Sequence, residues 1–234
     1  MSGLWPPPSK RFVFVEEGPP GVGDVERLEV AVPEVLDPQY GMYVWPCAVV
    51  LAQYVWFSRN TVRGRTFLEI GAGAGLPGIV AAKCGASVIL SDAAEIPNCL
   101  DNCRLSCQIN KLEDVPVIGL TWGQISPDLV LLPQIDVILG SDVFYDTEDF
   151  ENILTTIFYL IRKNPRALFW TTYQERSADW SIESLLYKWN LKCVHIPLET
   201  FEADEEFLAG SNLPGSHTIH MMMITFGTSV PSIT

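Results

Sequence analysis

The sequence is poor in positive charge. It holds 15 lysines and arginines against 28 aspartates and glutamates, which gives a formal net charge of −13 over 234 residues. Because proteins that bind nucleic acid use Lys and Arg to neutralise phosphates, this balance disfavours a nucleic-acid substrate. The same negative field would attract a basic protein segment, although solubility alone is the simpler reason for such a charge.

Long apolar runs and metal-binding patterns are missing as well. No uninterrupted apolar run approaches the roughly 20 residues of a membrane span, and the opening MSGLWPPPSK has no apolar core of signal-peptide length. The six cysteines form no C-x-x-C pair. Cys99, Cys103 and Cys107 recur every fourth residue and would share one helix face, but no fourth ligand cluster for zinc accompanies them. We expect free thiols in a reducing compartment, no metal and no membrane association.

The sequence also lacks the usual nucleotide motifs, yet it contains a related one, LEIGAGAGLPGI at 68–79. Residues 67–70 predict a short buried strand, and residues 77–84 predict a helix after a glycine turn. Such a corner offers the N–H groups of a helix N-terminus to an anionic ligand group. G-x-G-x-G differs from the G-x-G-x-x-G of dinucleotide enzymes, and no Gly-Lys-Ser/Thr follows, so a P-loop is excluded. The glycines are Gly71, Gly73 and Gly75, and alone they are equally compatible with a tight turn.

Two acidic residues flank the glycine turn. Glu69 lies inside the first predicted strand, immediately before the glycines. Asp92 ends the second predicted strand, about 20 residues after Gly71, which is the offset at which an acid binds a pair of ribose hydroxyls. Asp92 is also a candidate N-cap for the following helix. Both roles can coexist, and the glycines upstream favour ribose binding.

Strand and helix patterns alternate along the rest of the chain. This alternation predicts an α/β fold with a mostly parallel sheet and helices on both faces. The last strand follows an acidic loop and no crossover helix, so we expect it to pair antiparallel with its neighbour at one edge. The strands are expected at 66–70, 87–90, 116–120, 135–140, 167–172, 191–198 and 217–226, and the helices at 47–57, 77–84, 96–110, 149–163 and 179–189.

Three further segments complete the expected organisation. Segments 11–15 and 27–32 alternate well enough to predict a small N-terminal hairpin with a turn at 18–23, and 58–65 is expected as a polar loop. We expect one domain over 11–226, with tails at 1–10 and 227–234.

A second polar cluster, SDVFY, follows the predicted strand 135–140 and contains Ser141, Asp142 and Tyr145. Ligands of open α/β sheets bind outside the carboxyl ends of the strands. The cluster therefore lies beside the glycine turn if the first and fourth strands of the sheet are neighbours. Asp142 is either a buried acid that accepts a loop N–H, or an acceptor for a substrate amine or for the amino group of a cofactor.

Four sequence motifs, taken together and in chain order, resemble a known family. GMYVWP at 41–46, the glycine turn with Asp92, TWG around Trp122, and SDVFY are similar to the seven-strand S-adenosylmethionine-dependent methyltransferases. More narrowly, they resemble the family-sixteen protein-lysine methyltransferases, whose D-x-x-Y signature Asp142 and Tyr145 match. The resemblance covers roughly residues 27–226. It implies a Rossmann-like seven-strand methyltransferase fold and S-adenosylmethionine as the cofactor.

The resemblance also implies roles by position. Glu69 and the glycines would line the methionine half of the cofactor, Asp92 would hold the ribose, and Trp122 would pack against the adenine. Asp142 and Tyr145, the expected catalytic residues, would lie between cofactor and substrate. On sequence alone, Trp45 is better explained as a core or capping aromatic. The expected cofactor-binding residues are Trp45, Glu69, Gly71, Gly73, Gly75, Asp92, Trp122 and Ser141.

The activity that the resemblance implies is protein N-methylation in the nucleus and cytoplasm, with a basic protein as substrate and histone arginine as a candidate target. Lysine on a non-histone protein and an inert cofactor-binding module stay open as alternatives. Arginine would need carboxylates to orient it, for which Asp142 is one candidate and Glu202 or Glu205 another, if their loop folds over the site. We expect a monomer, and chaperone association, known among relatives of this family, is a further expectation.

Overall fold

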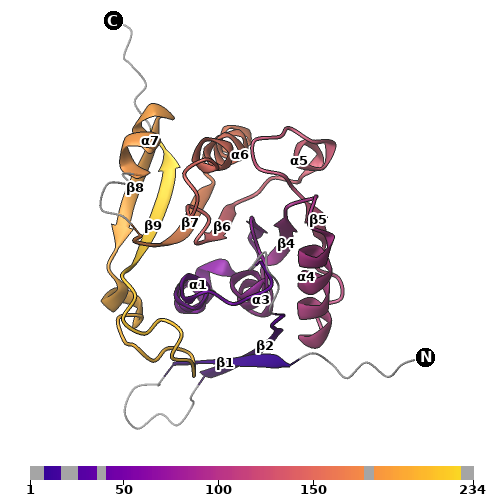
Figure 1. The fold of residues 1–234 in the computed structure, drawn as a ribbon, viewed down its shortest axis with the longest axis vertical. Helices are drawn as coiled ribbons and strands as arrows, with labels where there is room; N and C mark the ends of the chain where they lie inside the picture. Colours follow the sequence, from indigo (N-terminus) through magenta and orange to yellow (C-terminus); the bar gives the residue numbers. More distant parts are fainter. Residues whose placement is uncertain (1–7, 17–25, 36–40, 177–181, 228–234) are drawn as a thin grey trace, which may run out of the picture.

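The computed structural model describes residues 8–16, 26–35, 41–176 and 182–227. Within these residues seven strands form one sheet, with the order β5-β4-β3-β6-β7-β9-β8 (Figure 1). Strand β9 runs antiparallel to β7 and to β8, whereas the other neighbours pair in parallel. The predicted mostly parallel sheet with an antiparallel last strand is therefore confirmed. The strands are β3 (Thr66–Glu69), β4 (Ser87–Asp92), β5 (Val117–Gly119), β6 (Val137–Ser141), β7 (Leu168–Gln174), β8 (Leu191–Ile196) and β9 (Ile219–Phe226).

Helices cover both faces of the sheet because its central strands are apolar on both sides. Phe67, on β3, packs in the cluster with helices α1, α3 and α4, and its neighbour Leu68 packs in the cluster with α5, α6 and α7. This alternation is the two-residue period of a strand. The helices are α1 (Pro46–Phe57), α2 (Arg59–Val62), α3 (Leu76–Lys83), α4 (Pro97–Ile109), α5 (Pro127–Leu131), α6 (Phe150–Lys163) and α7 (Ile182–Lys188).

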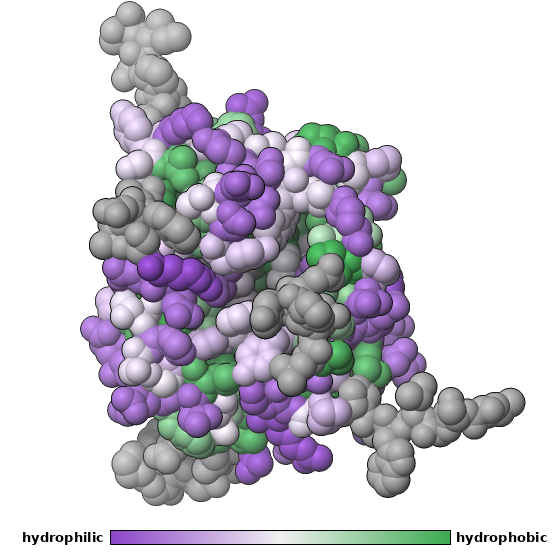
Figure 2. All heavy atoms as spheres, viewed as in Figure 1, coloured by the Kyte–Doolittle hydropathy of each residue, from purple (hydrophilic) through white to green (hydrophobic). Residues whose placement is uncertain are grey.

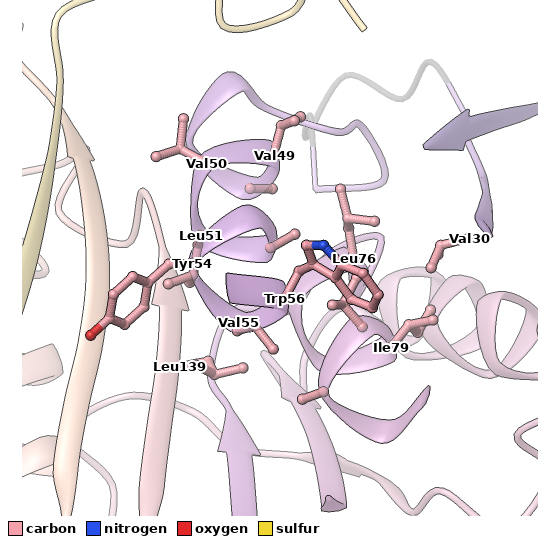
Figure 3. Packing of buried hydrophobic residues seen from close by; sticks show 14 of the residues in the cluster. Val30, Val49, Val50, Leu51, Tyr54, Val55, Trp56, Leu76, Ile79 and Leu139 are labelled. Carbon is pink, nitrogen blue, oxygen red and sulfur yellow. The ribbon is translucent and has the colours of Figure 1, made fainter. Parts of the chain in front are cut away.

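Helix α1 is buried along nearly its whole length, and every residue from Pro46 to Trp56 is inaccessible or almost so. Figure 3 shows its side chains pointing to opposite sides, with Tyr54 on one side and Trp56 directed toward Leu76 and Ile79 of α3. A helix that is apolar all round needs partners on every side. The sheet and α3 supply most of these partners, Phe201 packs against Tyr54, and Phe14 of the N-terminal hairpin packs against Trp56.

The hairpin consists of β1 (Ser9–Glu16) and β2 (Glu26–Pro33), paired antiparallel. Its inward side chains, Phe12, Phe14, Val30 and Val32, are fully buried. The side-chain amide of Asn110, at the end of α4, donates to the carbonyl of Ala31 and accepts from its N–H. The predicted hairpin is thus confirmed, while its predicted turn at 18–23 lies outside the described residues.

Some boundaries differ from the sequence-based expectation. The segment expected as a polar loop at 58–65 contains the short helix α2, and β1 begins at Ser9, inside the segment expected as a tail. After β8 the chain forms a 3-10 turn, η1 (Leu198–Phe201). The acidic loop that follows is fixed away from the start of α1, because Gln53 donates to the carbonyl of Phe201 and Val13 donates to that of Ala209. These contacts do not support a loop that carries Glu202 over the site.

The surface is hydrophilic over most of the face in Figure 2, with hydrophobic atoms gathered near α5. Large apolar side chains there include Leu131, which is 80% exposed. No helix in the described part of the chain has the length and apolar character to cross a membrane. All six cysteines lie within the described residues, and each is a free thiol.

Candidate functional site

The glycine turn lies where β3 ends, and all three of its predicted glycines have positive φ, with Gly75 at 74° as the N-cap of α3. Gly71 and Gly73 have φ of 57° and 55°, in the left-handed region that disfavours side chains. A Cβ on Gly71 would lie 2.9 Å from the ring of Trp122, and one on Gly73 would lie 2.4 Å from the carbonyl oxygen of Gly41. The predicted turn is therefore packed closely by two of the other blocks that the sequence singled out, GMYVWP and TWG.

The GMYVWP segment is held against this turn by cysteines of α4. A Cβ on Gly41 would lie 2.6 Å from the Sγ of Cys99, so only glycine fits between them. The thiol of Cys103, one turn further along α4, donates to the carbonyl of Gly73 at 3.1 Å. Burial raises the pKa of the Cys103 thiol well above its usual value, which keeps it protonated as a donor. The cysteine stripe is thus a packing surface for the glycine turn.

Asp92 ends β4 and binds the glycine turn directly. Its Oδ2 accepts from the N–H of Gly73 at 2.7 Å, and its Oδ1 accepts from the N–H of Ala93 at 2.8 Å. Desolvation raises the pKa of this carboxyl, and the two hydrogen bonds oppose the rise. The structure therefore brings Asp92 to the turn as the sequence predicted, and its contact with a ribose stays a prediction.

Glu69 is fully buried and faces the first turn of α3. Its Oε2 accepts from the N–H of Gly78 at 2.8 Å, while Oε1 has no hydrogen-bond partner among the described residues. Burial raises the pKa of Glu69 from 4.5 to about 8, the hydrogen bond from Gly78 opposes the rise, and the nearby Asp92 adds to it. One oxygen of Glu69 thus fastens the helix that follows the glycine turn, and the other is a buried oxygen without a partner among the described residues.

The SDVFY segment adjoins the glycine turn because β3 and β6 are neighbours in the sheet. A Cβ on Gly71 would lie 3.3 Å from Val143, the residue after Asp142. Ser141, at the end of β6, pairs in register with Thr172 of β7. The expectation that the first and fourth strands of the alternating series are adjacent is confirmed, and it unites the two polar clusters at one edge.

Asp142 forms a bidentate ion pair with Arg176, which follows the end of β7. Arg176 Nη1 donates to Oδ1 at 2.8 Å and Nη2 donates to Oδ2 at 2.6 Å. The Asp142 side chain is only 6% exposed, and its backbone has φ of 54°, a conformation that Asp tolerates better than most residues. Desolvation is the largest cause of the raised pKa of the buried Cys47 thiol, and the Asp142 carboxylate raises that pKa further. Asp142 is therefore a buried, ion-paired carboxylate.

Tyr145 lies at the exposed rim of this group, with about half of its surface accessible. Burial of the rest of the ring raises the pKa of its hydroxyl, and the carboxylates of Asp149, Asp92, Asp146 and Asp142 raise it further. The hydroxyl of Tyr145 is therefore close enough to both Asp92, beside the glycines, and Asp142 for their charges to raise its pKa. Trp45 is the N-cap residue of α1, where its ring meets the edge of Tyr43 at 5.6 Å between centroids.

The fold and this site define a class of protein that transfers a methyl group. A solved S-adenosylmethionine-dependent methyltransferase from Agrobacterium tumefaciens has a similar fold, with a TM-score of 0.54 and 16% identity, over 85% of this chain and 67% of that one. Residues 26–184 match a model of the lysine methyltransferase family, and the chain belongs to this family. It is an S-adenosylmethionine-dependent protein methyltransferase.

Two relatives are much more similar. Histone-arginine methyltransferase METTL23 of Mus musculus is 63% identical over 215 residues, which cover 92% of this chain and 85% of the mouse protein. The human protein of the same name is 64% identical over 185 residues, which cover 79% of this chain and 97% of the human protein.

S-adenosylmethionine fits the residues at this edge. The glycine turn carries only glycines and the small side chains of two alanines, Trp122 offers a flat ring beside Gly71, and Glu69 Oε1 is a buried acceptor without a partner among the described residues. When bound, the cofactor supplies an electrophilic methyl group on a sulfonium. The predicted site residues therefore gather around one edge, and their individual contacts with the cofactor stay predictions.

Sequence reasoning missed Arg176 and Gly41. An arginine a few residues after the predicted strand 167–172, at the sheet edge that binds ligands, was the available signal for Arg176. Its partner could not be identified, because the pairing depends on the adjacency of β6 and β7. The role of Gly41 had a weaker signal, since the close approach to Gly73 and Cys99 appears only after folding.

Proposed function

We propose that this methyltransferase acts on arginine side chains of histones. The observation that carries the proposal is the bidentate pairing of Asp142 with a guanidinium group at the edge that bears the glycine turn. A carboxylate that accepts one guanidinium fork has the geometry to orient another. The mouse and human relatives are named as histone-arginine methyltransferases, which agrees with this target. The net charge of −13 favours a basic substrate.

The chemistry assigns separate tasks to Asp142 and Tyr145. An arginine keeps its proton at neutral pH because its pKa is above about 12. A carboxylate that holds the guanidinium orients it and draws electron density toward one nitrogen, and most of the catalysis then comes from positioning. Asp142 performs this task. The raised pKa of Tyr145 keeps its hydroxyl protonated, so it remains a hydrogen-bond donor beside the reacting groups.

The cofactor contacts are part of the same proposal. Glu69 and the three glycines line the methionine half, Asp92 binds the ribose hydroxyls, and Trp122 packs on the adenine. The position of Trp122 against Gly71 and the hydrogen bond from Gly73 to Asp92 support this arrangement. Ser141 lies beside the methionine part, and Trp45 closes the entry side.

Lysine methylation of a non-histone protein is the second candidate, and the description of the matched family favours it. A lysine, with an ordinary pKa near 10.4, can lose its proton by desolvation beside a positive sulfonium. It offers no fork, so it gains less than arginine from a bidentate carboxylate. A third alternative, an inert cofactor-binding module, would bind S-adenosylmethionine without turnover.

The proposal also covers the location of the enzyme and its assembly with other proteins. A histone substrate means that the enzyme acts in the nucleus, and we expect a cytoplasmic pool as well. We further expect a monomer that associates with chaperones but not with nucleic acid. Cell fractionation, size-exclusion chromatography with light scattering, and affinity purification test these expectations separately.

The deciding experiment supplies radiolabelled S-adenosylmethionine to the purified chain with core histones. We expect label on a histone, and mass spectrometry should locate it on arginine. Asp142→Asn should abolish turnover while calorimetry still detects cofactor binding. Label on lysine would favour the second candidate, and cofactor binding without label on any protein of a cell extract would favour the inert module.

A matched control is Asp136→Asn. Asp136 accepts the backbone N–H of Thr66 at 2.9 Å, at the start of β3 and thus at the opposite edge of the sheet. The substitution makes the same chemical change as Asp142→Asn and should leave turnover intact. Weakened cofactor binding by Asp142→Asn, with unchanged turnover at saturation, would assign Asp142 to the cofactor and contradict its proposed role.

A further inference from the structure

Arg176 binds the residue to which the proposed function assigns the substrate. Its Nη1 and Nη2 each donate to a different oxygen of Asp142, so the guanidinium presents its end to the carboxylate as a symmetric fork. A substrate arginine oriented by the same carboxylate would offer the same two donors. The chain thus places one of its own guanidinium groups in the position that the proposed substrate requires.

The carboxylate has little room for two such partners at once. The Asp142 side chain is 6% exposed, and Oδ1 also lies 3.4 Å from the N–H of Gln174. Cys47, at the start of α1, lies behind it, and its carbonyl accepts the hydroxyl of Thr172 on β7. The Cys47 thiol and the backbone of β7 therefore occupy part of the surroundings of the carboxylate, and Arg176 holds both of its oxygens.

Arg176 is placed so that it can leave without disturbing the fold. Strand β7 ends at Gln174, and the backbone pairing beside β9 continues for one more residue, with the N–H of Glu175 donating to the carbonyl of Thr218, before the chain reaches Arg176. The Arg176 side chain is 28% exposed, well above that of its partner. It contributes no side chain to either apolar cluster. Release of Arg176 would thus leave the sheet intact and expose a single buried carboxylate, which requires a new cation.

We infer that Asp142 and the ends of β6 and β7 form a guanidinium-binding subsite, in which Arg176 is an intramolecular stand-in that a substrate arginine displaces. The identity of the substrate rests on the proposed function, whereas the subsite itself does not. A tethered competitor of this kind raises the substrate concentration that binding requires. It does not lower the reaction rate once the substrate is bound. A primary ammonium, which lacks the fork, would not replace it.

A binding experiment tests the subsite without any methyl transfer. Methylguanidinium chloride is titrated into the wild-type chain, Arg176→Ala and Asp142→Asn/Arg176→Ala, with thermal unfolding and calorimetry as readouts. We expect Arg176→Ala to bind methylguanidinium at least about tenfold more tightly than the wild type, because the tethered group competes at an effective concentration on the order of millimolar. The double variant should not bind it, and methylammonium chloride at equal ionic strength should bind none of the three.

A kinetic experiment separates displacement from a positioning role. With an arginine peptide as substrate, Arg176→Ala should lower KM at least about tenfold and leave kcat within about twofold, because only competition has been removed. Arg11→Ala, which removes an equal charge from an exposed pair with Glu29, should change neither parameter. Arg176→Gln, whose amide still donates to Asp142, should also lower KM, and it replaces Arg176→Ala if that variant fails to fold.

The outcomes are separable. Equal methylguanidinium affinities in the wild type and the Arg176 variant, or a fall in kcat with unchanged KM, would overturn the inference and make Arg176 a positioning residue. If Arg176→Ala binds methylguanidinium through Asp142 but no arginine in any histone is labelled, the proposed function fails and the subsite stands. If arginine is labelled but methylguanidinium never binds, the proposed function stands and the stand-in is excluded.

Discussion

The carbonyl oxygen of Gly41 lies against the α-carbon of Gly73, only 2.4 Å from where a Cβ on Gly73 would be. Gly41 itself has no space for a Cβ because of Cys99. The segment that enters α1 is therefore pressed between the glycine turn and α4. A disturbance of either glycine should reach both the cofactor site and the start of the buried helix.

Gly73→Ala should destabilise the protein and prevent cofactor binding. The left-handed φ of 55° costs about 1–2 kcal/mol for a residue with a Cβ, and the clash with the Gly41 carbonyl adds to this cost. Gly64→Ala is the matched control, because its φ of 76° imposes similar strain while nothing lies within 4 Å of the added Cβ. Thermal unfolding and calorimetric titration with S-adenosylmethionine measure both effects. Equal behaviour of the two variants would show that the Gly41 contact is unimportant.

Asp92→Ala should weaken cofactor binding by more than its effect on stability implies. It leaves the N–H groups of Gly73 and Ala93 without their acceptor, at a cost of about 1–3 kcal/mol each if they stay buried. Asp136→Ala likewise removes the acceptor of the Thr66 N–H, at the opposite edge of the sheet. We expect both variants to unfold at lower temperature and only Asp92→Ala to lose cofactor affinity. Retained affinity in Asp92→Ala would limit Asp92 to shaping the loop.

Trp122→Ala should lower cofactor affinity, and Trp122→Phe should retain most of it. The ring packs against Gly71, and an aromatic face contributes about 0.5–1.5 kcal/mol beyond the area that it buries. Trp189→Ala is a control of the same size, because Trp189 packs at a tilt against Phe158 and donates to Glu151, neither of which is assigned to the cofactor. Affinity for S-adenosylhomocysteine, measured by calorimetry, should fall only in the Trp122 variant. An equal loss in both alanine variants would indicate general destabilisation.

Glu69→Gln should change how stability depends on pH. Burial raises the pKa of Glu69 from 4.5 to about 8, so the stability that its neutral form provides is complete below pH 4.5 and is lost as pH rises through about 8. The amide does not titrate, so the variant should gain on the wild type by about 2–5 kcal/mol between pH 5 and pH 9. Urea unfolding at several pH values measures the difference. Parallel curves for the two proteins would mean that Glu69 is ionised in the folded state at pH 7.

The sequence predicted those features that depend on local pattern. Alternation located every strand of the sheet within a few residues, and apolar runs such as 67–70 identified the central strands because these strands are buried on both faces. The glycine turn followed from residue type, since Gly71 and Gly73 need left-handed backbone. Asp92 was found through its distance from Gly71 along the chain, which the strand–helix–strand geometry makes nearly constant.

Features that depend on packing between distant segments could not be predicted. The pairing of Asp142 with Arg176 joins the ends of two strands 34 residues apart, and nothing local distinguishes Arg176 from a solvated arginine. The close contacts of Gly41 likewise depend on how α4 meets the glycine turn. Helix α2 was missed because RNTV has no apolar periodicity, and the preceding buried helix sets its course.

The two-stranded cover over α1 and α4 has a consequence for how the chain reaches its folded state. Strands β1 and β2 are synthesised before the helices that they cover, and Asn110, which bonds to Ala31, is synthesised 79 residues after it. Until then the hairpin lacks its contact with α4, and Phe14 can meet only nearer partners such as Trp56 of α1. Closure of this non-local contact must therefore await the synthesis of α4, and during translation the hairpin should be the part that most needs protection from aggregation.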